Sequence, residues 1–147
     1  MFSKRCEYAI KAMIYLNSKS QLHQKININE IADSIDSPIA FTAKILQQLK
    51  KSGLITSSQG LKGGFQVDRG RNIKIQDIVY AIDGYGILNS CVLGLKSCSS
   101  LKPCPIHDNY LKIKTQILET IYDKDISEFS EYINNESIFL KTSNEYS

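Results

Sequence analysis

Apolar residues recur every three or four positions over residues 4–18, which predicts one amphipathic helix. Ser3 can cap this helix, because a serine hydroxyl accepts a hydrogen bond from a free amide of the first turn. A polar loop follows, and Asn27 with Glu30 three places on is typical of the capped start of a helix. The pattern therefore predicts a long and then a short helix within the first 35 residues.

The sequence Asp36-Ser37-Pro38 interrupts this pattern and predicts a third helix, with Ser37 as its cap and Pro38 as its first residue. This helix is expected to run to about Lys51 and to end at Gly53, which can adopt a left-handed conformation. Two helices separated by a few residues indicate a helix-turn-helix, and a helical hairpin with a solvated outer face is the alternative. The expected buried side consists of Ile39, Leu46 and Leu49, with Ala43 or Ile45, and the expected outer side of Phe41, Lys44, Gln47, Gln48 and Lys51.

Two short segments with strand-like alternation, residues 54–58 and 65–67, predict a β-hairpin directly after the third helix. The segment QGLKGG between them is rich in glycine, which allows positive φ angles and close approach of the backbone to another surface. A helix-turn-helix followed by such a hairpin is a winged helix. A nucleotide-binding loop is disfavoured, because the segment lacks the Gly-Lys-Ser/Thr sequence and opens no helix.

The second half of the chain predicts a short helix over residues 75–82 and a longer one over residues 106–122. The longer helix has an apolar stripe made of Tyr110, Ile113, Ile117, Leu118 and Ile121. A small winged helix seldom needs a second long apolar face, so we expect this stripe to join two chains in a homodimer. Packing of the stripe against its own winged helix is the alternative.

The predicted fold class is mainly α with a small β-hairpin wing, a winged helix-turn-helix followed by a long dimerisation helix. The predicted organisation is a DNA-binding domain over residues 1–84, a cysteine-containing loop over 85–105, the dimerisation helix and a short C-terminal helix over 106–136, and a flexible tail over 137–147.

Lysine and arginine are concentrated in the first half of the chain. Residues 1–74 contain twelve Lys/Arg and five Asp/Glu, whereas residues 75–147 contain six and ten, so net charges of +7 and −4 give the overall +3. This asymmetry favours binding of the first half to a polyanion, although clustered solvated charges would give the same sum.

The N-terminal segment starts basic and turns apolar, but Glu7, Lys11 and the lack of a small-residue cleavage site argue against a signal peptide. No apolar run approaches the ~18 residues needed to cross a bilayer. We therefore expect a cytoplasmic protein without membrane contact, whose four cysteines are reduced thiols or metal ligands. An enzyme is not expected, because no Cys/His/Asx set has a recognisable base and oxyanion site.

Three segments occur in this order along the chain: CEYAIKAMIYL, ILQQLKKSGLITSSQGLKGGFQV and NIKIQDIVYAIDG. Together they resemble the Rrf2 family of bacterial winged-helix transcription regulators, over about residues 1–125. The resemblance implies a homodimer that binds double-stranded DNA at a near-palindromic operator, whose half-sites lie one DNA turn or a multiple apart.

The resemblance also implies DNA contacts from the start of the first helix, from the recognition helix and from the wing. The residues at these positions are Ser3, Lys4, Ala40, Phe41, Ala43, Lys44, Ser58, Gln59 and Lys62. The family's cluster-binding regulator has Ser, Glu and Gln where this chain has Ala40, Ala43 and Lys44, so we expect a different operator. An alanine can contact a thymine methyl group, and a lysine can bind guanine or a phosphate.

Three cysteines lie between the last two predicted helices, at Cys91, Cys98 and Cys104, and His107 follows them. A structural zinc knuckle is disfavoured because no CxxC pair is present. Thiolates on a loop suit an iron–sulfur cluster, and cluster-binding members of the family carry three cysteines here. Such a cluster would sense redox state, iron or nitric oxide. The resemblance leaves two candidates for the fourth ligand, His107 or Glu7 of the partner subunit.

The spacing between the first two cysteines is one residue longer than is usual in the family. A cluster-free regulator, controlled by a protein partner or by oxidation of its thiols, therefore remains the alternative. The fourth cysteine, Cys6, lies on the apolar side of the first helix and is expected to be a buried core thiol.

Overall fold

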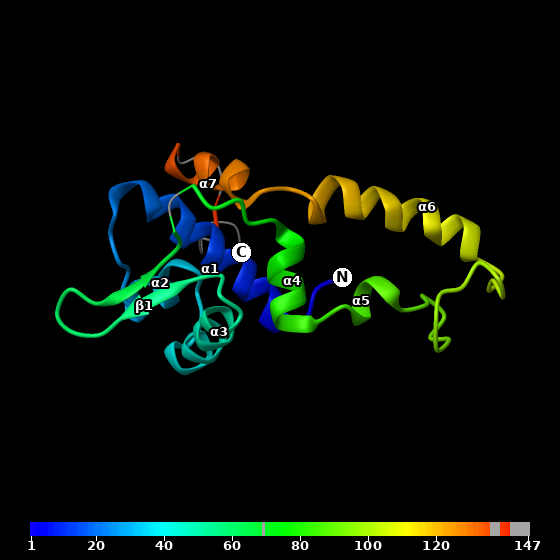
Figure 1. The fold of residues 1–147 in the computed structure, drawn as a ribbon, viewed down its shortest axis with the longest axis horizontal. Helices are drawn as coiled ribbons and strands as arrows, with labels where there is room; N and C mark the ends of the chain where they lie inside the picture. Colours follow the sequence, from blue (N-terminus) through cyan, green and yellow to red (C-terminus); the bar gives the residue numbers. More distant parts are fainter. Residues whose placement is uncertain (69, 136–138, 142–147) are drawn as a thin grey trace.

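The computed structural model describes residues 1–68, 70–135 and 139–141, and it confirms the mainly helical fold with a small hairpin. Figure 1 shows this arrangement. The first half contains α1 (Lys4–Lys19), a 3₁₀ turn (Ser20–Leu22), α2 (Ile28–Ser34), α3 (Ile39–Lys51), β1 (Thr56–Ser58) and β2 (Gly64–Gln66). The second half contains α4 (Ile75–Asp83), α5 (Gly86–Asn89), α6 (His107–Ile117), a π-helical turn (Leu118–Tyr122) and α7 (Ile126–Asn134).

The first two helices begin at the caps that the sequence predicts. Ser3 Oγ accepts a hydrogen bond from the Cys6 amide (3.1 Å), and Asn27 Oδ1 accepts one from the Glu30 amide (2.9 Å). The Glu30 carboxylate accepts a hydrogen bond from the Tyr15 hydroxyl (2.7 Å), which ties α2 to α1.

The start of α3 differs from the prediction by one residue, because Pro38 is the N-cap and Ile39 is the first helical residue. The expected buried side is also wrong at Ile39, whose side chain is 52% exposed. The Thr42 hydroxyl, which is buried, donates towards Ser37 Oγ and the Pro38 carbonyl, each at 3.0 Å. The buried side of α3 consists of Thr42, Ile45, Leu46 and Leu49.

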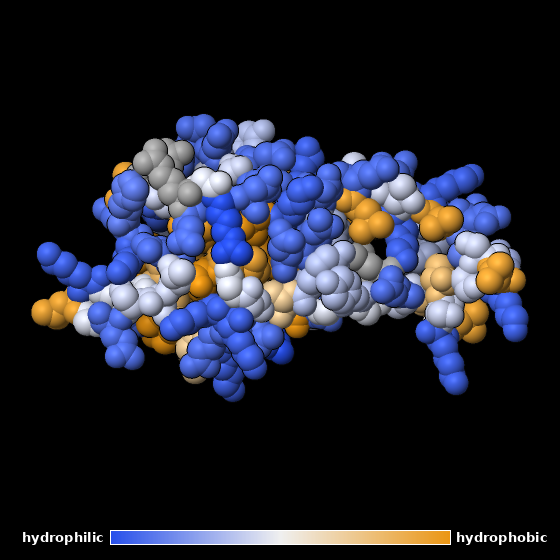
Figure 2. All heavy atoms as spheres, in the orientation of Figure 1, coloured by the Kyte–Doolittle hydropathy of each residue, from blue (hydrophilic) through white to orange (hydrophobic). Residues whose placement is uncertain are grey.

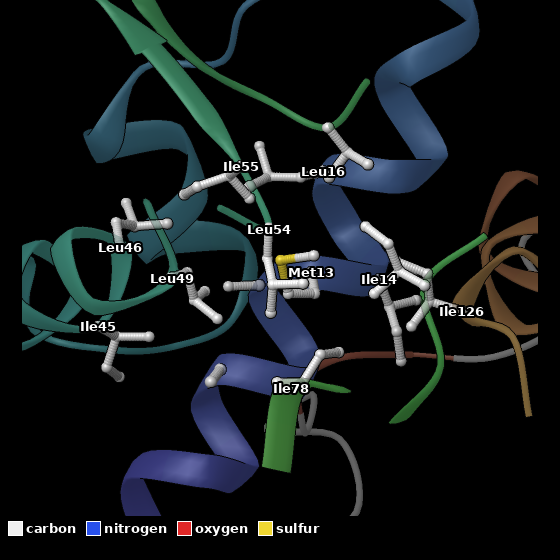
Figure 3. Close-up of a cluster of buried hydrophobic side chains, with 14 of the residues drawn as sticks. Met13, Ile14, Leu16, Ile45, Leu46, Leu49, Leu54, Ile55, Ile78 and Ile126 are labelled. Carbon is white, nitrogen blue, oxygen red and sulfur yellow. The ribbon is translucent and has the colours of Figure 1, made fainter. Parts of the chain in front are cut away.

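Side chains from α1, α3, α4, α7 and the segment before β1 meet in one hydrophobic core (Figure 3). The buried residues labelled there are Met13, Ile14, Leu16, Ile45, Leu46, Leu49, Leu54, Ile55, Ile78 and Ile126. Helix α1 passes through the middle of this core, between α3 and the start of α7. Burial of each large aliphatic side chain contributes roughly 1.5–3 kcal/mol, so the core fixes α3 and the hairpin relative to α1.

The hairpin forms an antiparallel ladder in which Thr56 lies opposite Gln66 and Ser58 opposite Gly64. Ile26, before α2, extends this ladder through two backbone hydrogen bonds of 2.9 Å with Phe65. Gly64 has a φ of 146°, and a Cβ atom there would lie 2.6 Å from the Ile26 carbonyl oxygen. The wing therefore requires glycine at this position for two separate reasons, its conformation and the close approach of another strand.

Gly64→Ala is expected to lower the free energy of unfolding by about 3 kcal/mol, since it adds a backbone clash to left-handed strain. Gly53→Ala is the matched control: Gly53 has a φ of 74°, but nothing lies within 4 Å of a Cβ built there. It should lose only about 1 kcal/mol. Urea unfolding of both variants measures the difference, and equal losses would show that the contact with Ile26 relaxes freely.

Two segments far apart in the sequence join α4 to α7. The Ile75 amide donates to the Lys124 carbonyl (3.0 Å), and the Ile126 amide donates to the Ile73 carbonyl (2.9 Å). Helix α7 lies along α1, where Asn17 Nδ2 donates to Ser130 Oγ (2.9 Å). These contacts attach the C-terminal helix to the first helix of the winged helix.

Helix α6, α5 and the loop between them extend away from this core (Figure 1). The π-helical turn after α6 returns to the core, where the Tyr122 ring lies 5.5 Å from that of Phe2. The predicted stripe is thus divided. Ile117, Leu118 and Ile121 pack against the chain's own core, whereas Ile113 is 54% exposed.

Of the tail predicted over residues 137–147, residues 139–141 are described, and Lys141 Nζ donates to the Asp33 carbonyl (3.3 Å). Residues 137, 138 and 142–147, like residue 136 before them, lie outside the described residues. Among the helices of the described segments, none is long and apolar enough to span a membrane.

Candidate nucleic-acid interface and cysteine loop

Helix α3 presents a basic face to solvent. Lys44, Lys50 and Lys51 are exposed on it, and Figure 2 shows hydrophilic surface at the lower edge of the molecule, where α3 lies. Gln48, which the sequence placed on this outer face, is half-buried, and its Nε2 donates to the Ala81 carbonyl (3.0 Å). Gln48 therefore orients α3 against α4.

Phe41 is half-buried and packs edge-to-face against Tyr8 of α1, with ring centroids 5.6 Å apart. Lys11 Nζ lies 4.3 Å from the centre of the same Tyr8 ring. These contacts hold the first turn of α3 against α1. They leave Ala40 exposed and Ala43 half-buried on the solvent side of α3.

The start of α1 is tied to the end of α4. The Ser3 hydroxyl donates to the Asp83 carboxylate, which also accepts from the Ser3 amide (3.1 Å). Lys4 is exposed, and its Nζ lies 3.1 Å from the Glu7 carboxylate. The hydrogen bond and charge of Glu7 raise the pKa of Lys4, so this lysine keeps its positive charge.

The wing projects beside α3, on the side of the molecule opposite to α6 (Figure 1). At the end of β1, directly before the loop of the wing, Ser58 Oγ accepts a hydrogen bond from Lys25 Nζ (2.8 Å). Gln59, Lys62 and Leu61 are exposed at the tip. Figure 2 shows hydrophobic surface at the end of the wing. The wing thus carries one basic and one apolar side chain at its end.

Ile39 is the residue of this face that sequence reasoning missed. The buried positions 42, 45, 46 and 49 follow the i, i+3, i+4, i+7 spacing of a helix face. The first of them is a threonine, which the sequence analysis did not include among the buried residues. Ile39 lies three residues before Thr42 and seven before Leu46, so helical spacing alone places it beside this face, and only the tertiary structure shows that it is exposed.

The cysteine loop brings its ligand-type residues together in two pairs. His107, at the start of α6, is buried, and its Nδ1 lies 3.5 Å from Cys98 Sγ. The other ring nitrogen, Nε2, lies 3.3 Å from Ser100 Oγ. The second pair is Cys91 and Cys104, whose side chain acts on the Cys91 thiol and lowers its pKa.

Hydrogen bonds to Cys91 from the backbone of Leu95 and Leu93, and then from the Cys104 side chain, lower the pKa of its thiol, because they stabilise the thiolate. Burial acts in the opposite direction and is outweighed. The Gly94 amide donates to the Cys91 carbonyl (2.9 Å) and closes a tight turn around the sulfur. Cys91 therefore lies in an environment that favours a metal-binding or redox-active thiol.

Three thiols and an imidazole are donor types that iron–sulfur clusters use, so the residues of this loop fit such a group chemically. Within the described residues, however, no three His, Cys, Asp or Glu side chains come together as a metal site. The loop would have to bring the two pairs closer together to hold a cluster. Glu7 lies apart on α1 and pairs with Lys4.

Cys6 is fully buried in the core, as predicted. Burial, followed by the charge and hydrogen bond of Asp83, raises the pKa of its thiol to about 12. Cys6 therefore remains protonated at neutral pH, unlike the thiolate that a metal site requires.

Sequence comparison shows the family of this chain. The sequence model of the Rrf2 family, described as an iron-dependent transcriptional regulator, matches residues 2–131. An HTH-type transcriptional regulator of Aquifex aeolicus is 30% identical over 120 residues, which are 80% of this chain and 82% of that protein. An rrf2-like HTH-type regulator of Rhodobacter capsulatus is 31% identical over 107 residues, 71% of this chain and 69% of that protein.

Two solved structures share the fold. CymR (YrzC), the global cysteine regulator of B. subtilis, has a TM-score of 0.75 at 18% identity and covers 90% of this chain and 97% of its own. T. potens IscR has a TM-score of 0.70 at 18% identity, covering 100% and 96%. The family match and the relatives confirm the resemblance: this chain belongs to the Rrf2 family of winged-helix transcriptional regulators, which are not enzymes.

Proposed function

We propose that the protein is a homodimeric, sequence-specific DNA-binding regulator whose operator affinity depends on an iron–sulfur cluster held by residues 91–107. The observation that carries the DNA-binding part is the exposed basic face of α3 beside a wing with Lys62 at its tip. Residues 1–84 would bind DNA, 85–105 would carry the cysteines, and 106–136 would join the protomers.

In this proposal α3 enters the major groove and the wing reaches the adjacent minor groove or backbone. The contacting residues would be Ser3, Lys4, Ala40, Phe41, Ala43, Lys44, Ser58, Gln59 and Lys62. Lysine side chains would bind phosphates and supply most of the affinity. Because Phe41 is half-buried against Tyr8, it would act mainly by holding α3 in position.

Homodimer formation is supported by the exposed part of α6. Ile113 is 54% exposed on a helix that extends from the core, where a second copy can cover it. A two-fold dimer would place two α3 helices on the half-sites of a near-palindromic operator.

The proposed cluster ligands are Cys91, Cys98 and Cys104, with His107 or Glu7 of the partner subunit as the fourth. The short distance from Cys98 Sγ to His107 Nδ1 supports His107. When bound, the cluster would supply a centre that responds to redox state, iron or nitric oxide. Glu7 of the partner subunit would instead link the cluster directly to the helix that begins the DNA-binding domain.

A cluster-free regulator controlled by thiol oxidation is the second candidate. The contact between Cys91 and Cys104, together with the lowered pKa of Cys91, favours it. A related fold, S. aureus CymR, has been solved in an oxidised form.

The test is selection of genomic DNA fragments with anaerobically purified protein, combined with iron and acid-labile sulfide analysis. We expect a small set of sites with half-site symmetry, and an affinity that changes when the cluster is removed. A colourless, iron-free dimer that binds the same sites with full affinity would support the second candidate instead. Failure to select any site would contradict both.

Lys62→Gln is expected to weaken binding to all duplexes and to lower the slope of log affinity against log salt by about one, because one phosphate contact is lost. Lys102→Gln is the control, since Lys102 is also exposed but lies in the cysteine loop. Fluorescence anisotropy over a range of salt concentrations measures both slopes. An unchanged slope for Lys62→Gln would place the wing away from the phosphates.

A further inference from the structure

We propose that the first half of α3 reads thymine methyl groups through the apolar surface of Ile39, Ala40 and Ala43, so that each operator half-site has thymines where α3 begins. This inference rests on the proposed DNA-binding function and extends it to the chemistry of the bases that are recognised. It assigns a role in sequence specificity to Ile39, which the sequence analysis had predicted to be buried in the core.

The start of α3 offers no polar side chain to a base. Within residues 38–43, all of which the structure describes, the only side chain able to form a hydrogen bond is that of Thr42. Thr42 is fully buried, and its hydroxyl lies 3.0 Å from both Ser37 Oγ and the Pro38 carbonyl. The N-terminal residues of a recognition helix are those that usually contact base edges. Here they can do so only through apolar groups.

The apolar side chains lie on one face of the helix. Ile39, Ala40 and Ala43 have the i, i+1, i+4 spacing of one helix face, and Lys44 and Gln47 continue this face towards the end of α3. Ile39 is 52% exposed and Ala40 is exposed. In Figure 2, hydrophobic surface lies beside hydrophilic surface at the lower edge of the molecule, below the wing.

The thymine C5-methyl group is the apolar feature that base pairs present in the major groove, and it distinguishes thymine from the other bases. An exposed isoleucine gains from covering this methyl group, because both groups leave water. Lysines at positions 44, 50 and 51 would meanwhile bind phosphates or a guanine. The apolar contacts would thus lie at the start of α3, and the charged side chains would follow from Lys44 onwards.

The test uses the operator found by fragment selection, with single thymines of one half-site replaced by uracil, which lacks only the methyl group. The wild-type dimer is expected to lose about fourfold in affinity for each methyl group that α3 contacts. Ile39→Ala is expected to bind the thymine operator more weakly. At one position it should also bind the uracil and thymine duplexes equally well, as in a double-mutant cycle.

Leu22→Ala is the matched control, because Leu22 is a similarly exposed aliphatic residue (60%) that precedes α2. It should retain every methyl effect of the wild type. The inference is overturned if uracil has no effect at any position, as expected when α3 begins against phosphates only. It is overturned equally if Ile39→Ala keeps all the wild-type methyl effects. Absence of any selected fragment would instead contradict the proposed function itself.

Discussion

Ile113→Asp is expected to convert the protein into a monomer and to lower its affinity for a complete operator about 100-fold or more. A dimer binds its second half-site at a high effective concentration, and a monomer loses this advantage. A carboxylate in the centre of an apolar interface would be buried without a partner, which opposes association. Sedimentation velocity reports the oligomeric state, and anisotropy with full and half operators reports the affinity.

Thr115→Asp is the matched control, since Thr115 is exposed on the opposite side of α6 and receives the same charge. This variant should remain a dimer with wild-type affinity. Because Ile113 is 54% exposed in the single chain, its substitution should leave the fold of the protomer intact. A dimeric Ile113→Asp protein would show that α6 does not form the interface between protomers. The apolar stripe would then serve only to pack α6 and the following turn against the core of the same chain.

Cys98→Ser is expected to reduce the iron and acid-labile sulfide of anaerobically purified protein to background and to alter operator affinity accordingly. Serine replaces the thiolate that iron–sulfur clusters require with a poor ligand of similar size. The same change removes the sulfur atom that lies 3.5 Å from His107 Nδ1, without enlarging the side chain. Metal analysis and visible absorbance measure the loss directly.

Cys6→Ala is the control for this experiment, because the Cys6 thiol is buried and its pKa is raised to about 12. The Cys6→Ala variant should retain the cluster.

Comparison of His107→Ala with Glu7→Gln then identifies the fourth ligand, since only the variant that lacks a ligand should lose or destabilise the cluster. Wild-type protein without iron under anaerobic conditions would contradict the cluster and favour control by thiol oxidation.

Local signals made much of this fold predictable. The caps at Ser3 and Asn27 and the left-handed end of α3 at Gly53 involve residues within a few positions of one another, and each is present in the structure. The glycines of the wing were an equally local signal, because the sequence alone predicted a turn between the two strands. Their most demanding contact, between Gly64 and Ile26, joins segments that the sequence did not connect.

The sequence by itself determined the order of the helices, the hairpin and the presence of cysteines in one loop, because backbone conformation and helical spacing depend on near neighbours. Only the tertiary structure decided which side of α3 is buried, since that depends on α1 and α4. There, Thr42 is covered, Gln48 bonds to Ala81, and Ile39 remains exposed. It also decided that His107 lies beside Cys98, and Cys91 beside Cys104, because the path of a long loop follows from contacts that no local pattern encodes.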